Sequence, residues 1–145
     1  MKKIIQKQLG QLLIDCNLLK PDQLEEALKI QKEKGGLIGR ILVHMGAVTE
    51  EQIAKALTAQ YGFPYLPLGG YEIDPQVAKC IPEHVAKQYE LIAVDRVGNV
   101  LTLSMSNPLN TQAVEDVEMM THCKVQVFVS TGTDVNEAIK KYYKM

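Results

Sequence analysis

Arginine is scarce in this chain of 145 residues, which contains only Arg40 and Arg96. Bidentate recognition of phosphate or guanine by guanidinium groups therefore has few candidates. The formal net charge is −1, which provides no positive field to attract a polyanion. These two features argue against a duplex-binding protein, so we expect no DNA or RNA partner.

Signals for membranes, disulfides and metals are also missing. The longest apolar runs, residues 91–94 and 100–105, are too short to cross a bilayer, and the first residues lack a signal-peptide pattern. We therefore expect a cytoplasmic protein without membrane insertion. Cys16, Cys80 and Cys123 form no CxxC pair, which indicates reduced thiols in the interior. The three histidines lack metal-ligand spacing, and no acidic pair suggests acid–base catalysis.

A 24-residue unit is present twice in the first sixty residues. Residues 8–31 read QLGQLLIDCNLLKPDQLEEALKIQ, and residues 37–60 read LIGRILVHMGAVTEEQIAKALTAQ. Six aligned positions are identical: Gly10/Gly39, Leu13/Leu42, Gln23/Gln52, Ala27/Ala56, Leu28/Leu57 and Gln31/Gln60. Internal duplication indicates architecture directly. Two similar helical units can also present two half-sites to a single two-lobed ligand.

Each unit is predicted to form two short helices. Apolar residues recur at helical spacing within residues 9–16 and 38–45, and the pattern stops at Asn17 and at Gly46. The second helix of the first unit is expected to begin at Pro21. In the second unit, Thr49 and Gln52 match the capping box. Residues 1–61 are therefore predicted to form a subdomain of two helical hairpins, whose core contains four matched leucines: Leu13, Leu28, Leu42 and Leu57.

The composition changes after Tyr61. Residues 62–70 contain two prolines and three glycines, which excludes a helix. Strands are predicted at residues 91–95, 100–104 and 124–129, and helices at residues 110–120 and 133–143. Brief helices are expected to begin near Asp74 and Pro82. Residues 62–145 are thus predicted to form a small α+β subdomain with a short, mainly antiparallel sheet, and the fold class is α+β.

The doubled pattern L-G-x-x-L-L…L-x-x-A-L-x-x-Q resembles the N-terminal domain of the assembly ATPases of type II secretion and type IV pili. Residues 63–65, 81–82, 106–110 and 137–143 also resemble this family, so the resemblance covers nearly the whole chain. It implies a non-catalytic regulatory and docking domain, peripheral to the inner membrane on the cytoplasmic side. The implied partners are the C-terminal ATPase domain and the cytoplasmic parts of the secretion or pilus platform.

The ATPase machinery itself is missing from the sequence. No phosphate-loop motif G-x-x-x-x-G-K-[ST] is present, so we expect no ATP hydrolysis. We expect an N-terminal portion of a longer protein, and a stand-alone relative is the alternative.

The resemblance also implies cyclic di-GMP as a candidate ligand. We expect no other cofactor and no metal. A subset of the family binds this ligand through the doubled motif. Backbone N–H groups beside the glycines would approach a phosphate, and the glutamines would bind a base edge. The candidate ligand-binding residues are Gln8, Leu9, Gly10, Leu13, Gln31, Ile38, Gly39, Arg40, Leu42, Gln60 and Asn107.

Two departures from the family pattern favour an alternative, a protein-docking module that binds no nucleotide. Gln8 stands where binding members have arginine, and Asn107 lies in a stretch where the family commonly has aspartate. Loss of one charged hydrogen bond costs about 1.5–3 kcal/mol. Arg40 or the nearby lysines are the candidates to compensate for the missing charge. Individual residues also have structural alternatives: close helix packing for the glycines, helix termination for the glutamines, and a turn for Asn107.

Overall fold

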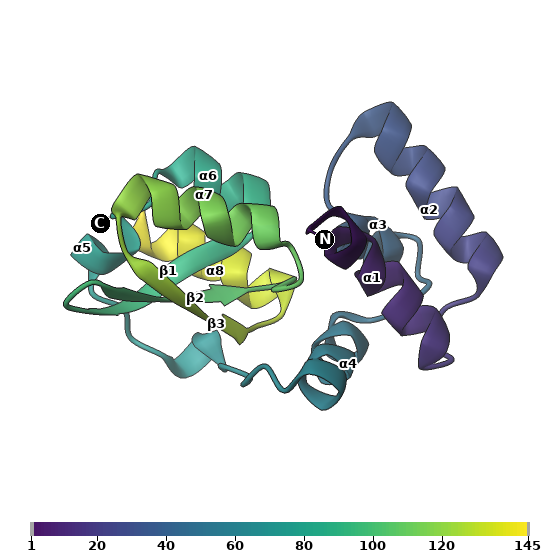
Figure 1. The fold of residues 1–145 in the computed structure, drawn as a ribbon, viewed down its shortest axis with the longest axis horizontal. Helices are drawn as coiled ribbons and strands as arrows, with labels where there is room; N and C mark the ends of the chain where they lie inside the picture. The colour runs from purple at the N-terminus through teal and green to yellow at the C-terminus, as the bar shows by residue number, and fades with distance from the viewer. Residues whose placement is uncertain (1, 145) are drawn as a thin grey trace.

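The computed structural model describes residues 2–144, with side chains from residue 9 to residue 144. Figure 1 shows two parts, an N-terminal group of helices and a C-terminal sheet covered by helices. The first part contains α1 (Lys2–Asp15), α2 (Pro21–Lys34), α3 (Ile38–His44) and α4 (Glu50–Tyr61). The second contains the 3-10 turn η1 (Leu68–Gly70), α5 (Pro75–Ala78), α6 (Glu83–Tyr89), β1 (Leu91–Val97), β2 (Val100–Met105), α7 (Thr111–Thr121), β3 (Lys124–Val129) and α8 (Gly132–Tyr142).

The four predicted N-terminal helices are confirmed, and the duplication extends to how the helices end. Asn17 and Gly46, which occupy matched positions after α1 and α3, both have left-handed φ values of 60° and 75°. In each repeat the next amide N–H donates to the carbonyl five residues earlier. This is the Schellman bond that ends a helix at a left-handed residue. The repeated sequence therefore encodes a repeated local structure.

The identical glutamines Gln23 and Gln52 cap the second helix of each repeat. Gln23 Oε1 accepts the Lys20 N–H at 2.9 Å, and Gln52 Oε1 accepts the Thr49 N–H at 2.9 Å. Thr49 Oγ1 accepts the Gln52 N–H at 3.1 Å, which confirms the predicted capping box. The identity of Gln23 and Gln52 is thus explained by capping, because the first N–H groups of each helix have no partner within the helix.

The core of the repeats departs from internal symmetry at one leucine. Leu13, Leu42 and Leu57 are fully buried, as predicted, but Leu28 is 49% exposed. The prediction for Leu28 is therefore wrong, although Leu57 occupies the matched position.

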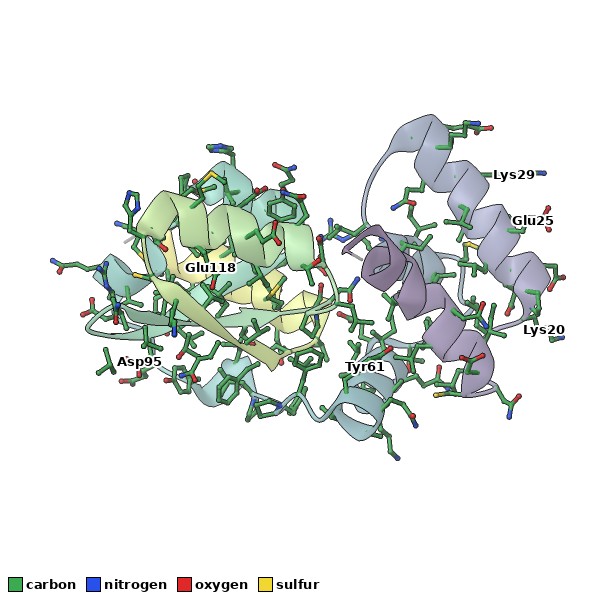
Figure 2. All side chains as sticks on the ribbon, viewed as in Figure 1. Lys20, Glu25, Lys29, Tyr61, Asp95 and Glu118 are labelled. Carbon is green, nitrogen blue, oxygen red and sulfur yellow. The ribbon has the colours of Figure 1, made fainter. Side chains whose placement is uncertain are left out.

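The difference between Leu28 and Leu57 follows from where their helices lie. The helix α2 forms the outer edge of the molecule in Figure 1, whereas α4 contacts β3 of the other part. Figure 2 shows Lys20, Glu25 and Lys29 along the outer side of α2. A helix at the edge has no second layer to cover its outward side, so the matched leucine remains in solvent.

The α+β class is confirmed, but the sheet is mixed rather than mainly antiparallel. Its strand order is β1-β2-β3, and the β1–β2 hairpin turns through Gly98, which has φ 61°. The strands β1 and β2 pair antiparallel, whereas β3 pairs parallel with β2. The parallel pair follows from α7, which carries the chain back across the sheet before β3 begins.

Helices cover both faces of β1. Leu91 and Ala93 belong to one buried cluster with Val117 of α7, and Ile92 belongs to another with Ile139 of α8. A strand buried on both faces reads as a continuous apolar run, as residues 91–94 do.

The two parts also share a buried contact. Leu109 and Val129 belong to the α+β part, but both lie in the apolar cluster of the helical repeats. The division at residues 61 and 62 remains a prediction. None of the described helices is long and apolar enough to cross a membrane.

Candidate functional site

A cavity of about 640 Å³ lies between the helical repeats and the α+β part. The repeats contribute residues from all four of their helices. The end of α6, the loop after β2 and one side of α8, from Gly132 to Lys140, complete the wall. Small-molecule sites typically have volumes of about 300–1,000 Å³. The cavity is therefore large enough for a ligand of several rings.

Six of the eleven predicted site residues line this cavity: Leu9, Gln31, Ile38, Gly39, Arg40 and Asn107. Four others do not: Gly10, Leu13, Leu42 and Gln60. Leu13 and Leu42 are buried in the core, and Gln60 is exposed on α4. The side chain of Gln8 lies outside the described residues. The two matched glutamines are thus not brought together, and the cavity lies beside the repeats rather than between their equivalent ends.

The two repeat glycines have different surroundings. A Cβ added at Gly10 would lie 2.5 Å from Leu24 Cδ1, so a larger residue in α1 would fit here only if the Leu24 side chain of α2 moved. At Gly39 the nearest atoms are Leu9 Cδ2 at 3.4 Å and Ile53 Cδ1 at 3.7 Å, which are ordinary contact distances. Leu24 and Ile53 occupy matched positions. This geometry favours the packing alternative for Gly10, whereas Gly39 forms part of the cavity wall.

The polar side chains Gln31 and Asn107 are both positioned by local hydrogen bonds. Gln31 Nε2 donates to the Gly36 carbonyl at 3.0 Å, which fixes the amide at the end of α2. Asn107 Oδ1 accepts the Leu109 N–H at 3.2 Å, so the turn alternative for Asn107 is confirmed. Both side chains still line the cavity and keep further hydrogen-bonding capacity.

Glu90 is a cavity residue that the sequence analysis missed. It follows α6 in a left-handed conformation with φ 54° and is only 4% exposed. Its Oε2 accepts from Arg40 Nη2 and from Asn136 Nδ2, the latter at 2.9 Å. A buried carboxylate needs such donors, because desolvation of an unpaired charge is costly. No sequence pattern singles out Glu90, which stands at the start of an apolar strand.

Glu50 forms a second polar link across the cavity. Its carboxylate accepts hydrogen bonds from the N–H and Oγ1 of Thr133, with an Oγ1 to Oε2 distance of 2.6 Å. Thr133 lies in the first turn of α8, where the helix dipole favours a negative charge. Glu50 of α4 therefore supplies an anion to α8 and connects the two parts of the chain.

The charged residues of the cavity wall give it both signs of charge. Two are cationic and three are anionic: Arg40 and Lys140, and Glu50, Glu90 and Glu137. The side chain of Arg40 is 47% exposed, so it keeps donors for a ligand. No group of three or more His, Cys, Asp or Glu side chains among the described residues could hold a metal ion.

Tyr89 lines the cavity as a neutral hydrogen-bonding group. Its hydroxyl donates to Asp116 Oδ2, and this bond, with burial and the charge of Asp116, raises the pKa of Tyr89. The phenol therefore retains its proton over the physiological range.

Comparison with known proteins places the chain among pilus and secretion proteins. A family model described as the MshEN domain matches residues 61–145. The type IV pilus assembly ATPase PilB of Myxococcus xanthus is 34% identical over 136 residues, which cover 94% of this chain and 24% of that protein. PilB of Thermus thermophilus is 34% identical over 139 residues, covering 94% of this chain and 16% of that protein. The chain thus spans about a quarter or less of these relatives.

Two solved structures share the fold. A structure of MshE with cdg has a TM-score of 0.68 and 26% identity, and the match covers 93% of this chain and 98% of that chain. The N-terminal domain of XpsE has a TM-score of 0.75 at 18% identity, covering 96% of both chains. The second match shows likeness of fold alone.

Proposed function

The chain belongs to the MshEN domain family, as an N-terminal domain of the type II secretion and type IV pilus assembly ATPases, and we propose that it regulates and docks such an ATPase by binding cyclic di-GMP. It does not contain the catalytic ATPase domain of these proteins. The proposed binding site is the cavity between the helical repeats and the α+β part.

The observation that carries the proposal is that both repeat copies contribute to a single cavity. The first copy contributes Leu9 and Gln31, and the second contributes Ile38 and Gly39. The half-buried Ile38 side chain offers apolar surface to purine and ribose faces, whereas Leu9 is fully buried and supports the wall from beneath. The amide of Gln31 offers a donor and an acceptor to a base edge. The MshE structure with cdg, taken as cyclic di-GMP, supports the same ligand class.

The ligand carries two phosphates, and the cavity wall carries a net negative charge. Arg40 and Lys140 are the cations available to these phosphates. A ligand held between the two parts would favour the arrangement to which it binds best, and this preference would pass to an attached ATPase domain. The proposal places the protein in the cytoplasm, against the inner-membrane platform of the secretion or pilus system.

Isothermal titration with cyclic di-GMP, together with thermal unfolding, tests the proposal. Binding at a hundredfold excess over Kd stabilises the native state by about 2.7 kcal/mol. Arg40→Ala should weaken binding roughly ten- to hundred-fold through the loss of a charged hydrogen bond. Gln60→Ala is the control, because Gln60 is exposed and outside the cavity. The absence of both heat and a melting shift at about 100 µM ligand would refute the proposal.

A second function, docking without nucleotide, is favoured by a specific set of observations. Gln8 and Asn107 replace charged residues of the family pattern, and three carboxylates line the cavity. In this alternative the chain contacts cytoplasmic segments of the platform. A pull-down with purified platform segments tests it, and failure of the folded chain to capture any of them would exclude it.

A further inference from the structure

The carboxylate of Glu90 is held rigidly at the cavity wall. Its N–H donates to the Ala86 carbonyl at the end of α6, and its carbonyl accepts the Ser106 N–H at 3.2 Å. Arg40 and Asn136 hold Oε2 of the side chain. A group fixed on both its backbone and its side chain is suited to selecting between ligands, because little ordering remains to be done on binding.

The second oxygen of this carboxylate, Oε1, differs from Oε2 in its hydrogen bonding. No described residue donates a hydrogen bond to it, although the side chain of Glu90 is only 5% exposed. The backbone of Gly132 lies beside it, since a Cβ added there would be 2.6 Å from Glu90 Oε1. The same Cβ would be 3.2 Å from Glu50 Oε1, so two carboxylates meet around Gly132 in the cavity wall. Such a place favours a group that donates hydrogen bonds.

We infer that Glu90 is the specificity-determining residue of the cavity and selects guanine over adenine through Oε1. The inference rests on the proposed function. Guanine presents two adjacent N–H donors on its Watson–Crick edge, and an ionised carboxylate is an acceptor only. Adenine presents one donor beside a ring-nitrogen acceptor, whose lone pair would face the carboxylate.

Asn107 is less suited to this role. Its Oδ1 already accepts the Leu109 N–H of the turn. Glu50 is also engaged, because both of its carboxylate oxygens accept from Thr133. Glu90 therefore provides an acceptor of the kind that the family pattern expects near Asn107, but from the end of α6.

The test compares cyclic di-GMP with cyclic di-AMP by isothermal titration into the intact chain. Wild type should prefer cyclic di-GMP. Glu90→Gln should lower affinity for cyclic di-GMP roughly ten- to hundred-fold and leave the affinity for cyclic di-AMP unchanged or higher. Glu83→Gln is the matched control, since Glu83 lies on α6 outside the cavity, paired with Lys87 at 2.9 Å. It should keep the wild-type ratio of affinities.

The ratio separates ligand selection from a purely structural role, which would weaken both dinucleotides equally. If Glu90→Gln binds both ligands with the wild-type ratio, the inference is overturned and the proposed function stands. If wild type binds neither ligand, both the inference and the proposed function are refuted. Should Glu90→Gln fail to fold, Gly132→Ala replaces it, because the added Cβ displaces the same carboxylate without a change of charge. An unchanged ratio in Gly132→Ala would also overturn the inference.

Discussion

The matched glycines Gly10 and Gly39 should respond oppositely to the same substitution. Alanine at Gly10 places a Cβ 2.5 Å from Leu24 Cδ1 and 2.9 Å from Leu24 Cδ2, so the leucine has to move. Alanine at Gly39 meets nothing closer than 3.4 Å. The two positions are matched in sequence but differ in how closely the neighbouring side chains approach and in their place along the helix, with Gly10 inside α1 and Gly39 in the first turn of α3.

The expected changes in the free energy of unfolding combine a gain in helix propensity with a cost of steric displacement. Replacing glycine by alanine in a helix interior contributes about 1 kcal/mol of stability. At Gly10 the displacement of Leu24 costs about 1–3 kcal/mol, so a net loss of about 1 kcal/mol is expected. At Gly39, in the first turn of α3, a net gain of about 0.5 kcal/mol is expected. The two variants should then differ in melting temperature by roughly 3–6 °C.

Urea unfolding of both variants, alone and in a Leu24→Ala background, measures these terms. Removal of the leucine side chain opens space, so Gly10→Ala should become stabilising there, with a coupling energy equal to the displacement cost of about 1–3 kcal/mol. Gly39→Ala should be unaffected by that background. The reasoning is refuted if Gly10→Ala stabilises as much as Gly39→Ala, or if its cost persists without Leu24.

Three further variants test other parts of the structure. Leu57→Ala should lose about 2–5 kcal/mol in urea unfolding, whereas Leu28→Ala should change stability by less than about 1 kcal/mol; equal losses would contradict the asymmetry of the repeats. Arg40→Ala should cost about 1–3 kcal/mol, because the buried Glu90 carboxylate loses its charged donor, and a neutral result would exclude a stabilising ion pair. Burial raises the pKa of Tyr143 well above its usual value of 10.0, so the unfolded chain loses this proton first and stability should fall as pH rises past 10. The Tyr143→Phe variant should show a shallower fall in urea midpoint between about pH 9 and pH 11, and an unchanged fall would contradict this cause.

Local structure was predictable because its causes lie within a few residues. The ends of α1 and α3, the start of α2, the cap of α4 and the bounds of β3 follow from left-handed residues, an N-terminal proline, capping side chains and apolar spacing. Each of these interactions joins residues that are close in the chain. The parallel pairing of β3 was missed because strand direction depends on the path of the whole α7 crossover.

The amino-acid sequence alone determined the family, the four repeat helices and the candidate aliphatic and amide residues Leu9, Ile38 and Gln31. Only the tertiary structure decided which glycine lies against a neighbouring helix and which leucine is exposed. It also decided that the cavity lies between the two parts. The reason is separation along the chain. Arg40 meets Glu90 across 50 residues, and Glu50 meets Thr133 across 83, so no local pattern records either contact.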